Sequence, residues 1–288
     1  MQAFSFSVDL VHMHIIKFSS NKRGSKNLQI TYQNTLLSSV SNIKFLGLQL
    51  DENITWKMHV QKILPKLSSA CYLIRRMHPF FDLKTLKMIY FAYFHSVMEY
   101  GIIFWGNSTE SKKILLQQKK ILRIMTGSHT RASCRTLFCK LGILTMVAQY
   151  LLSLMRFLAS NLEIFTFNNS IHNVNTRTIL KLHKPTTRLK LKHQGPYNNC
   201  VNIYNKLPDD LAKLIKNKKS FLDQLKVYLT DKPFYTLDEF FEQWQSLLAI
   251  LAYLTEGNTH IHLNINLRHT HIYTHTLGNL YFGSLSRL

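Results

Sequence analysis

Hydrophobic and polar positions divide the chain into a β-prone start and a helical remainder. Two short β-prone runs, residues 15–18 and 28–32, flank a turn-rich segment and predict a hairpin. A third run, residues 43–51, contains Gly47, and a glycine within such a strand marks a bulge or the close approach of another backbone. From Trp56 onward, apolar residues recur every three or four positions, which is the period of a helix with one buried face.

Three helices follow in the predicted order. Pro79 ends the first, and Asp82 is a suitable N-cap for the second. The second, residues 83–100, is apolar and aromatic almost all round, which predicts that it is buried in the middle of a bundle. The third begins near Asn107, with Glu110 three residues later in the spacing of a capping box.

The rest of the chain predicts a smaller mixed region. Helices are expected at 133–141 and 145–160, and residues 164–184 are expected to be irregular. Residues 188–192 alternate basic and apolar side chains, as a strand with one charged face does. Two more helices are marked by Pro208 with Asp209 and by Phe221, Leu225, Tyr228 and Leu229. The predicted class is α+β, mostly α: N-terminal β-hairpins, a helical bundle and a small α+β C-terminal region.

Residues 245–288 differ from the rest in composition. Residues 259–262 and 269–276 alternate Thr and His, and their His-x-His pairs suggest a metal site because imidazole is the commonest metal ligand. A CA-dinucleotide repeat, however, is translated as Thr-His-Thr-His, so compositional bias explains the pattern more simply. We therefore expect a disordered, low-complexity tail without a metal site.

Positive charge is the strongest signal of composition. Lys and Arg total 36 against 15 Asp and Glu, a net charge of +21, and residues 241–288 contribute nothing to this surplus. So large a surplus repels itself, and a bound polyanion commonly neutralises it. A merely basic soluble protein and a binder of anionic membranes remain alternatives.

The third predicted helix concentrates this charge. At about 100° per residue, five cations fall within about a third of its circumference. They are Lys112, Lys113, Lys119, Lys120 and Arg123. Apolar Ile114, Ile121, Leu122 and Met125 lie opposite, and only Leu116 interrupts the basic face. Because solvated faces normally mix signs, we predict that this face contacts nucleic-acid phosphates. A second set of candidates is Arg177, Arg188, Lys190 and Lys192.

Several classes of protein are not indicated. The four cysteines form no Cys-x-x-Cys pair, so neither a zinc site nor a disulfide framework is predicted. The N-terminus lacks the pattern of a secretory signal, and polar residues interrupt the longest apolar stretches, 88–105 and 144–158. We expect an intracellular protein, nuclear or cytoplasmic, with no membrane partner and no small-molecule substrate.

Specific motifs then carry a family resemblance. The run from Lys44 to Asp51, followed by Trp56-Lys57-Met58-His59, resembles the segment after the palm in jockey-like and related non-LTR reverse transcriptases. Further runs that resemble the family follow in order: Ser96 to Gly101, Phe104-Trp105-Gly106, Asn173 to Arg177, Gly195-Pro196-Tyr197, Tyr204 to Pro208 and Phe234 to Phe240. The order and spacing make the resemblance specific over roughly residues 10–244.

The resemblance implies a division of the chain. Residues 1–58 would be β-hairpins at the palm edge, with Phe45, Leu46 and Gly47 as a primer grip. Residues 59–126 would be a thumb-like helical bundle that closes on the template–primer duplex, and 127–244 the C-terminal region. The implied partner is RNA, DNA or an RNA–DNA hybrid.

The resemblance also shows what the sequence lacks. Family polymerases hold two Mg²⁺ ions on palm carboxylates, two of which are adjacent in an aromatic-x-Asp-Asp turn. The turn would precede residue 1, and the one Asp-Asp pair here, Asp209-Asp210, is explained by N-capping and helix-dipole stabilisation. His12 and Met13 stand where the family usually carries Lys-Thr. We therefore expect no catalytic residues, no enzyme activity and no cofactor.

The sequence predicts a remnant of an RNA-directed DNA polymerase that retains sequence-independent template–primer binding. Two alternatives stay open. One is a non-functional product translated from a pseudogene, and the other is a basic nucleic-acid-binding module recruited by a host.

Overall fold

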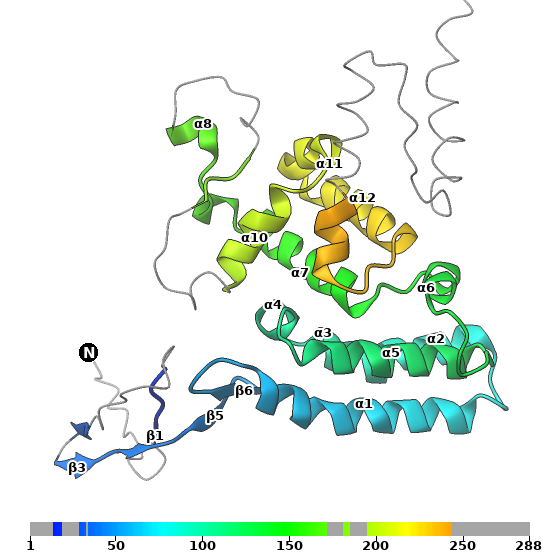
Figure 1. The fold of residues 1–288 in the computed structure, drawn as a ribbon, viewed down its shortest axis with the longest axis horizontal. Coiled ribbons are helices and arrows are strands. Elements are labelled where there is room, and N and C mark those ends of the chain that lie inside the picture. Colours follow the sequence, from blue (N-terminus) through cyan, green and yellow to red (C-terminus); the bar gives the residue numbers. More distant parts are fainter. Residues whose placement is uncertain (1–13, 19–28, 33, 172–180, 185–194, 244–288) are drawn as a thin grey trace, which may run out of the picture. The chain divides into compact units, whose positions relative to one another are not determined.

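The computed structural model describes residues 14–18, 29–32, 34–171, 181–184 and 195–243. Residues 1–242 form one compact unit. The described part is mostly helical with a few short strands, which confirms the predicted α+β, mostly α class (Figure 1). The predicted strand at 188–192 and the predicted tail from 245 lie outside the described residues.

The first strands pair differently from the prediction. Strand β1 (His14–Ile15) pairs in parallel with β4 (Ser38–Ser39), and β2 (Thr31–Tyr32) pairs antiparallel with β3 (Thr35–Leu36). The predicted hairpin between residues 15–18 and 28–32 is therefore wrong. Strand β2 pairs with a strand that begins three residues after β2 ends. Closing this short loop costs less chain entropy than closing the longer loop back to residues 15–18 would cost.

The next two strands form the hairpin that places the expected primer grip. Strands β5 (Asn42–Phe45) and β6 (Leu48–Asp51) pair antiparallel, with Phe45 opposite Leu48. Leu46 and Gly47 form the turn with φ of 45° and 82°, the positive values that a two-residue turn of this hand requires. Gly47 thus lies in a turn and not in a bulge, which corrects the prediction.

Helix α1 (Lys57–Met77) follows the predicted pattern. Its buried residues are His59, Val60, Ile63, Leu67, Ala70, Cys71 and Ile74, which form one stripe along the helix. The helix ends just before Pro79, as predicted. Helix α1 packs on residues 83–99 and, most extensively, on residues 111–125, so it forms one side of the bundle.

The second predicted helix is divided into α2 (Leu83–Ile89), the π-helical η2 (Tyr90–His95) and α3 (Ser96–Glu99). Asp82 caps it as predicted, because its Oδ1 accepts a hydrogen bond from the Thr85 amide at 3.0 Å. The prediction of burial all round is wrong, since Met88 and Tyr93 are 57% and 58% exposed. Only the face that meets α1 and the following helices is covered by described residues.

The third predicted helix begins later than expected. A short helix α4 (Ile102–Trp105) comes first, and α5 spans Ser111–Met125. Glu110 does not form a capping box but pairs with the Lys113 ammonium at 2.5 Å. Helices α1 and α5 lie side by side and run in the same direction, because the Cys71 thiol meets Gln117 while residues nearer both C-termini line a common hollow (Figure 1).

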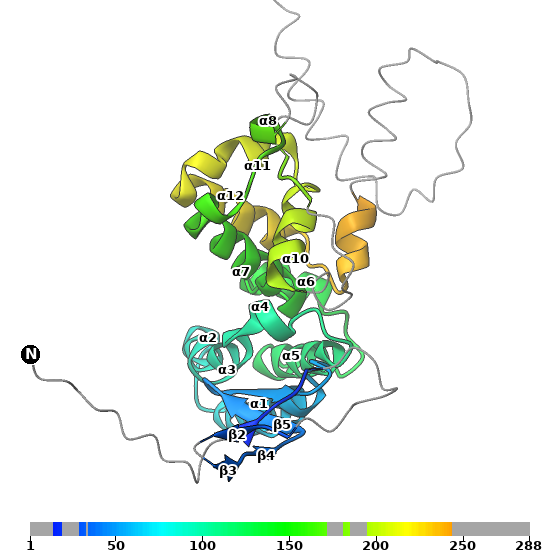
Figure 2. The ribbon, with the colours of Figure 1, turned by 90° about the vertical axis from the view of Figure 1, so that its left-hand side faces the viewer.

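The C-terminal part of the unit contains α6 (Arg135–Leu141), α7 (Met146–Ser160), η3 (Leu162–Ile164), α8 (Asn168–Ile171), α10 (Pro196–Tyr204), α11 (Asp209–Lys213), η4 (Leu214–Lys216) and α12 (Lys218–Asp231). Helix α7 packs against both α10 and α12 (Figure 2). The predictions for α6, α7, α11 and α12 are confirmed, whereas α10 was not predicted. The expected irregular segment contains η3, α8 and a bridge between Phe167 and Leu182 where it is described.

A buried amide joins these parts. Gln118 on α5 is fully buried, and its Nε2 donates to the Tyr90 hydroxyl at 2.8 Å and to the Leu144 carbonyl at 2.9 Å. Its Oε1 accepts from the Met146 amide at 2.8 Å. That amide is one of the first N–H groups of α7, which no intrahelical carbonyl can satisfy. Gln118 therefore completes the N-terminus of α7 from a different helix.

Candidate nucleic-acid interface

Helix α5 presents the predicted division between apolar and basic sides. Ile114, Ile121, Leu122 and Met125 are buried, which confirms the assignment of the apolar face. Leu116 is 64% exposed on the opposite side, as expected. The five predicted cations do not share one environment, however, and they divide into an engaged pair and an exposed set.

Lys119 and Arg123 are engaged with other parts of the chain. The Lys119 ammonium lies 3.4 Å from the centroid of the Tyr235 ring, and Arg135 lies 4.3 Å from the same centroid. Arg123 donates two hydrogen bonds to the Ala132 carbonyl, from Nε at 3.0 Å and from a terminal nitrogen at 2.9 Å. Both cations therefore already have partners within the protein.

Burial accompanies this engagement. It lowers the pKa of the Lys119 ammonium from its usual value, and the charges of Arg135 and Arg123 act in the same direction. Burial also raises the pKa of Tyr235 to about 12, so the ring keeps its proton and offers a neutral aromatic face to the cations. The cluster is an internal contact between α5 and the segment after α12.

Lys112, Lys113 and Lys120 are exposed. Lys113 is paired with Glu110, while Lys112 and Lys120 have no ion pair with a described acid. Lys120 lies on the side of α5 that faces α1, where it joins cations from another element.

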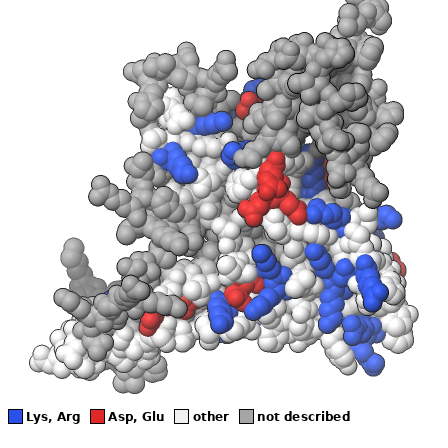
Figure 3. All heavy atoms as spheres, in the orientation of Figure 1, with Lys and Arg blue, Asp and Glu red and all other residues white. Residues whose placement is uncertain are grey.

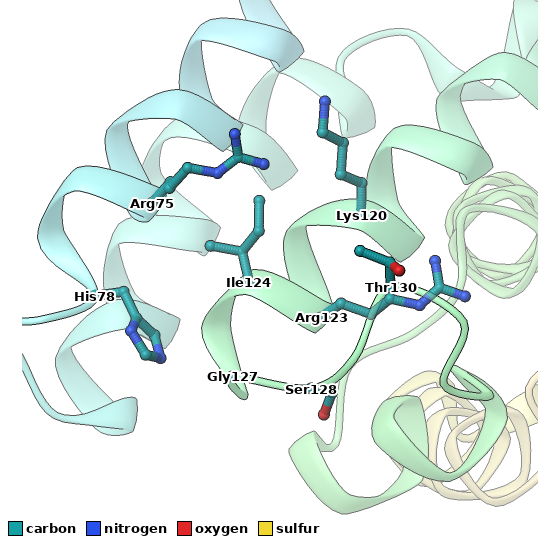
Figure 4. Close-up of a pocket in the computed structure, with 8 residues that line it drawn as sticks. All are labelled: Arg75, His78, Lys120, Arg123, Ile124, Gly127, Ser128 and Thr130. Carbon is teal, nitrogen blue, oxygen red and sulfur yellow. The ribbon is translucent and has the colours of Figure 1, made fainter.

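The end of α1 supplies those cations. Arg75, Lys120 and His78 line a hollow of about 520 Å³ between the C-terminal parts of α1 and α5, which Thr130 and Ser128 help to close (Figure 4). Arg75 from α1 and Lys120 from α5 point to the same side of Ile124 (Figure 4). Arg123 extends away from them, toward its partner in the loop.

We call the exposed cations at this end the basic edge: Arg75, Arg76, Lys120 and Arg131. In the described part of the chain, none of the four forms an ion pair. Figure 3 shows Lys and Arg side chains gathered over the ends of α1 and α5, while acidic side chains lie mostly nearer the centre of that face. The excess charge is thus concentrated locally.

A second hollow has a different character. It measures about 500 Å³ and lies beside the loop before α1, with Trp56, Phe104 and Pro196 among its lining residues. It is lined by no charged residue. Of these two hollows, only the one at the basic edge is therefore suited to an anion.

The expected primer-grip residues lie at an exposed hairpin tip. Leu46 is 74% exposed, and its carbonyl accepts a hydrogen bond from the Tyr100 hydroxyl. A Cβ on Gly47 would lie 3.2 Å from the Tyr100 ring, so the close approach predicted here is made by a side chain rather than a backbone. Gly101 adopts φ of 62°, and its lack of a Cβ leaves room for the Leu48 side chain, which would lie 2.7 Å from a Cβ added there.

Comparisons of the chain with models of protein families, with curated proteins and with solved structures find no match. The resemblance to non-LTR reverse transcriptases therefore stays a prediction. So do the roles of the five α5 cations, of the hairpin tip and of the proposed subdivision of residues 1–244.

The remaining predicted features are placed as follows. Arg177, Arg188, Lys190 and Lys192 lie outside the described residues. Asp209 and Asp210 occupy the first turn of α11, as expected, but Pro208 holds the N-cap position and neither carboxylate caps the helix. Among the residues that the structure describes, no three His, Cys, Asp or Glu side chains are placed to hold a metal ion.

The described part of the chain has no single helix long and apolar enough to cross a membrane. Helices α6 and α7 meet that criterion only when they are counted together across a bend of 52°.

Sequence reasoning missed Arg75, His78 and Tyr235. Arg75 and Arg76 end α1, where cations commonly complement the helix dipole, and that signal was available. Nothing local indicates that Arg75 and Lys120 line one hollow, or that Tyr235 covers Lys119, because both arrangements depend on how distant elements pack.

Proposed function

We propose that the described part of the chain binds a nucleic-acid duplex without sequence preference, through contacts between its cations and phosphates. The duplex would be RNA, DNA or an RNA–DNA hybrid, and the role would be that of the thumb and following region of a non-LTR reverse transcriptase. The observation that carries the proposal is the basic edge, where exposed cations from neighbouring elements gather without ion pairs to described acids.

Side-chain placement supports the family role at a second point. Motif residues far apart in the sequence meet, since Tyr100 contacts the turn at Leu46 and Gly47, and the Trp105 indole donates to the Tyr100 carbonyl at 3.0 Å. The hairpin is thereby fixed to the helical bundle. A grip and a thumb that act on one duplex need such a fixed relation.

Duplex binding is expected to weaken steeply with salt, because each phosphate contact releases condensed counterions. The triple variant R75Q/R76Q/K120Q should flatten the slope of log K against log salt by about two to three, since each lost contact removes about one. Glutamine preserves helix propensity, so the fold should be unaffected. Fluorescence anisotropy over a salt series with an unrelated pair of duplexes measures both the slope and the sequence dependence.

A matched control is K216Q/K218Q/K219Q, which removes three exposed lysines around the start of α12 and the same net charge. Its slope should stay near that of the unmodified protein. Equal flattening by both triple variants would show a response to net charge alone. Absence of any salt-dependent binding would refute the proposal itself.

Polymerase activity is expected to be absent. The sequence contains no aromatic-x-Asp-Asp turn, and its single Asp-Asp pair lies at exposed positions at the start of α11. The purified protein should add no deoxynucleotides to a primed RNA template with Mg²⁺ or Mn²⁺. Template-dependent extension above that of a mock preparation would contradict this expectation.

A further inference from the structure

We propose that the hollow between the C-terminal parts of α1 and α5 is a binding site for a single phosphate group, with Arg75 and Lys120 as its charged ligands. The inference deepens the proposed function and rests on it for the source of the phosphate, a nucleic-acid backbone. The binding chemistry itself follows from the hollow alone.

The two cations suit an oxyanion in complementary ways. The Arg75 guanidinium is planar and can donate two parallel hydrogen bonds to one phosphate, whereas the Lys120 ammonium acts as a compact charge. They come from different helices and point to the same side of Ile124 (Figure 4). Thr130 lies at the rim, and no acidic residue lines the hollow.

The buried thiol of Cys71 does not neutralise these cations. Cys71 lies four positions before Arg75 on α1, and its thiol contacts Gln117. Burial raises the pKa of the Cys71 thiol to about 11, although the charges of Lys120 and Arg75 act in the opposite direction. At neutral pH the thiol keeps its proton, so the two positive charges have no counterion from this residue.

The wall of the hollow is fixed before any ligand binds. The two hydrogen bonds from Arg123 to the Ala132 carbonyl fasten the loop that carries Thr130. Gly127 adopts φ of 62° and lies against the His78 imidazole, which joins the end of α5 to the end of α1. The hollow, of about 520 Å³, has ample room for a phosphate group, and a wall fixed in this way needs little rearrangement when one binds.

A competing explanation is that these cations only complement the negative C-terminal ends of the two helices. Dipole effects fall off within the last turn. Arg75 lies in the last turn of α1, but Lys120 lies five positions before the end of α5. The dipole explanation therefore does not account for Lys120 or for its convergence with Arg75.

Inorganic phosphate tests the site directly, with the full chain and with chloride at matched ionic strength as the reference. Phosphate at ten times its Kd should raise the melting temperature by roughly 3 to 6 °C relative to chloride. R75Q and K120Q should each weaken phosphate binding by roughly ten-fold or more, because hydrogen bonds to charged groups are lost. K66Q is the matched control, since it removes an exposed lysine of α1, the helix that carries Arg75, outside the hollow, and should change binding less than two-fold.

Two further arms identify the source of the phosphate. A duplex with 5′-hydroxyl ends should compete with inorganic phosphate if backbone phosphates enter the site, and a 5′-phosphorylated duplex should compete no better. Stronger competition only by the phosphorylated duplex would assign the site to terminal phosphates and overturn the backbone source. Equal stabilisation by phosphate and chloride, or equal losses in K66Q and K120Q, would overturn the site while leaving salt-dependent duplex binding intact.

Discussion

Replacing Gln118 with leucine is expected to lower the free energy of unfolding by roughly 3 to 5 kcal/mol. The substitution leaves the Leu144 carbonyl and the Met146 amide without their buried partner, and the Tyr90 hydroxyl loses its donor. Each unsatisfied buried group destabilises by about 1 to 3 kcal/mol. Urea denaturation followed by circular dichroism measures the change, and an unchanged m-value would confirm that the denatured state is unaffected.

Gln117 provides the control, because it is adjacent on α5 and only half-buried. Its side-chain oxygen meets the Cys71 thiol at 3.8 Å, and thiols are weak donors. Q117L should therefore change stability by less than about 1 kcal/mol. Similar losses in Q117L and Q118L would mean that the buried amide network does not determine the stability of α7.

Replacing Gly106 with alanine is expected to destabilise the fold by roughly 2 to 3 kcal/mol through steric overlap. Its φ of −60° suits any residue, so backbone strain does not contribute. An added Cβ would lie 2.4 Å from Cδ2 of Tyr150, and that side chain is almost fully buried on α7. Because the ring is enclosed, relieving the overlap requires a shift of the ring or of α4 against α7.

A double-mutant cycle with Y150L measures how much of the destabilisation comes from steric overlap between the added Cβ and the Tyr150 ring. Leucine removes part of the ring that alanine would meet, so the two substitutions together should destabilise less than the sum of the single changes, by about 1 kcal/mol. Thermal or urea denaturation of the four proteins provides the values. Strict additivity would show that Gly106 matters for a reason other than its contact with Tyr150.

Local signals were sufficient for most helices. Pro79 and Asp82 mark a helix end and a helix start whatever the rest of the chain does, and the predicted boundary between α1 and α2 is correct for that reason. Helix α10 carried an equally local signal, a proline at its first position, which was used only as part of a family motif. Its omission was an error of interpretation and not a limit of the sequence.

Which strands pair, and which helix faces neighbouring helices bury, cannot be read from any short stretch of sequence. Strand β1 finds its partner at Ser38, and the choice depends on the competing partners available to every strand. The wheel of residues 83–100 correctly showed apolar side chains all round, but it could not show which of them neighbouring helices would cover. Met88 and Tyr93 are exposed because coverage is a tertiary property.

Only part of the candidate interface could be predicted from the sequence, because its contacts with distant elements also depend on tertiary packing. A helical wheel correctly separated the cations of α5 from its buried face, because that separation depends only on helix geometry. It could not show that Tyr235 occupies the space beside Lys119, or that Arg75 from another helix joins Lys120. The face predicted as one surface is two surfaces, an internal one and an exposed one.

The segment from Pro233 to Phe240 has a consequence for synthesis on the ribosome. Thr145 donates to the Phe234 carbonyl across 89 positions of sequence, and Arg135 pairs with Glu239 across 104. At about 5 to 20 residues per second, translation needs roughly 5 to 20 s to pass from one partner to the other. Within that interval α7 is completed after α5 and α6, but the segment that covers part of their surface has not yet been made. A chaperone that recognises nascent chains would therefore encounter these helices before the segment from Pro233 to Phe240 has been translated.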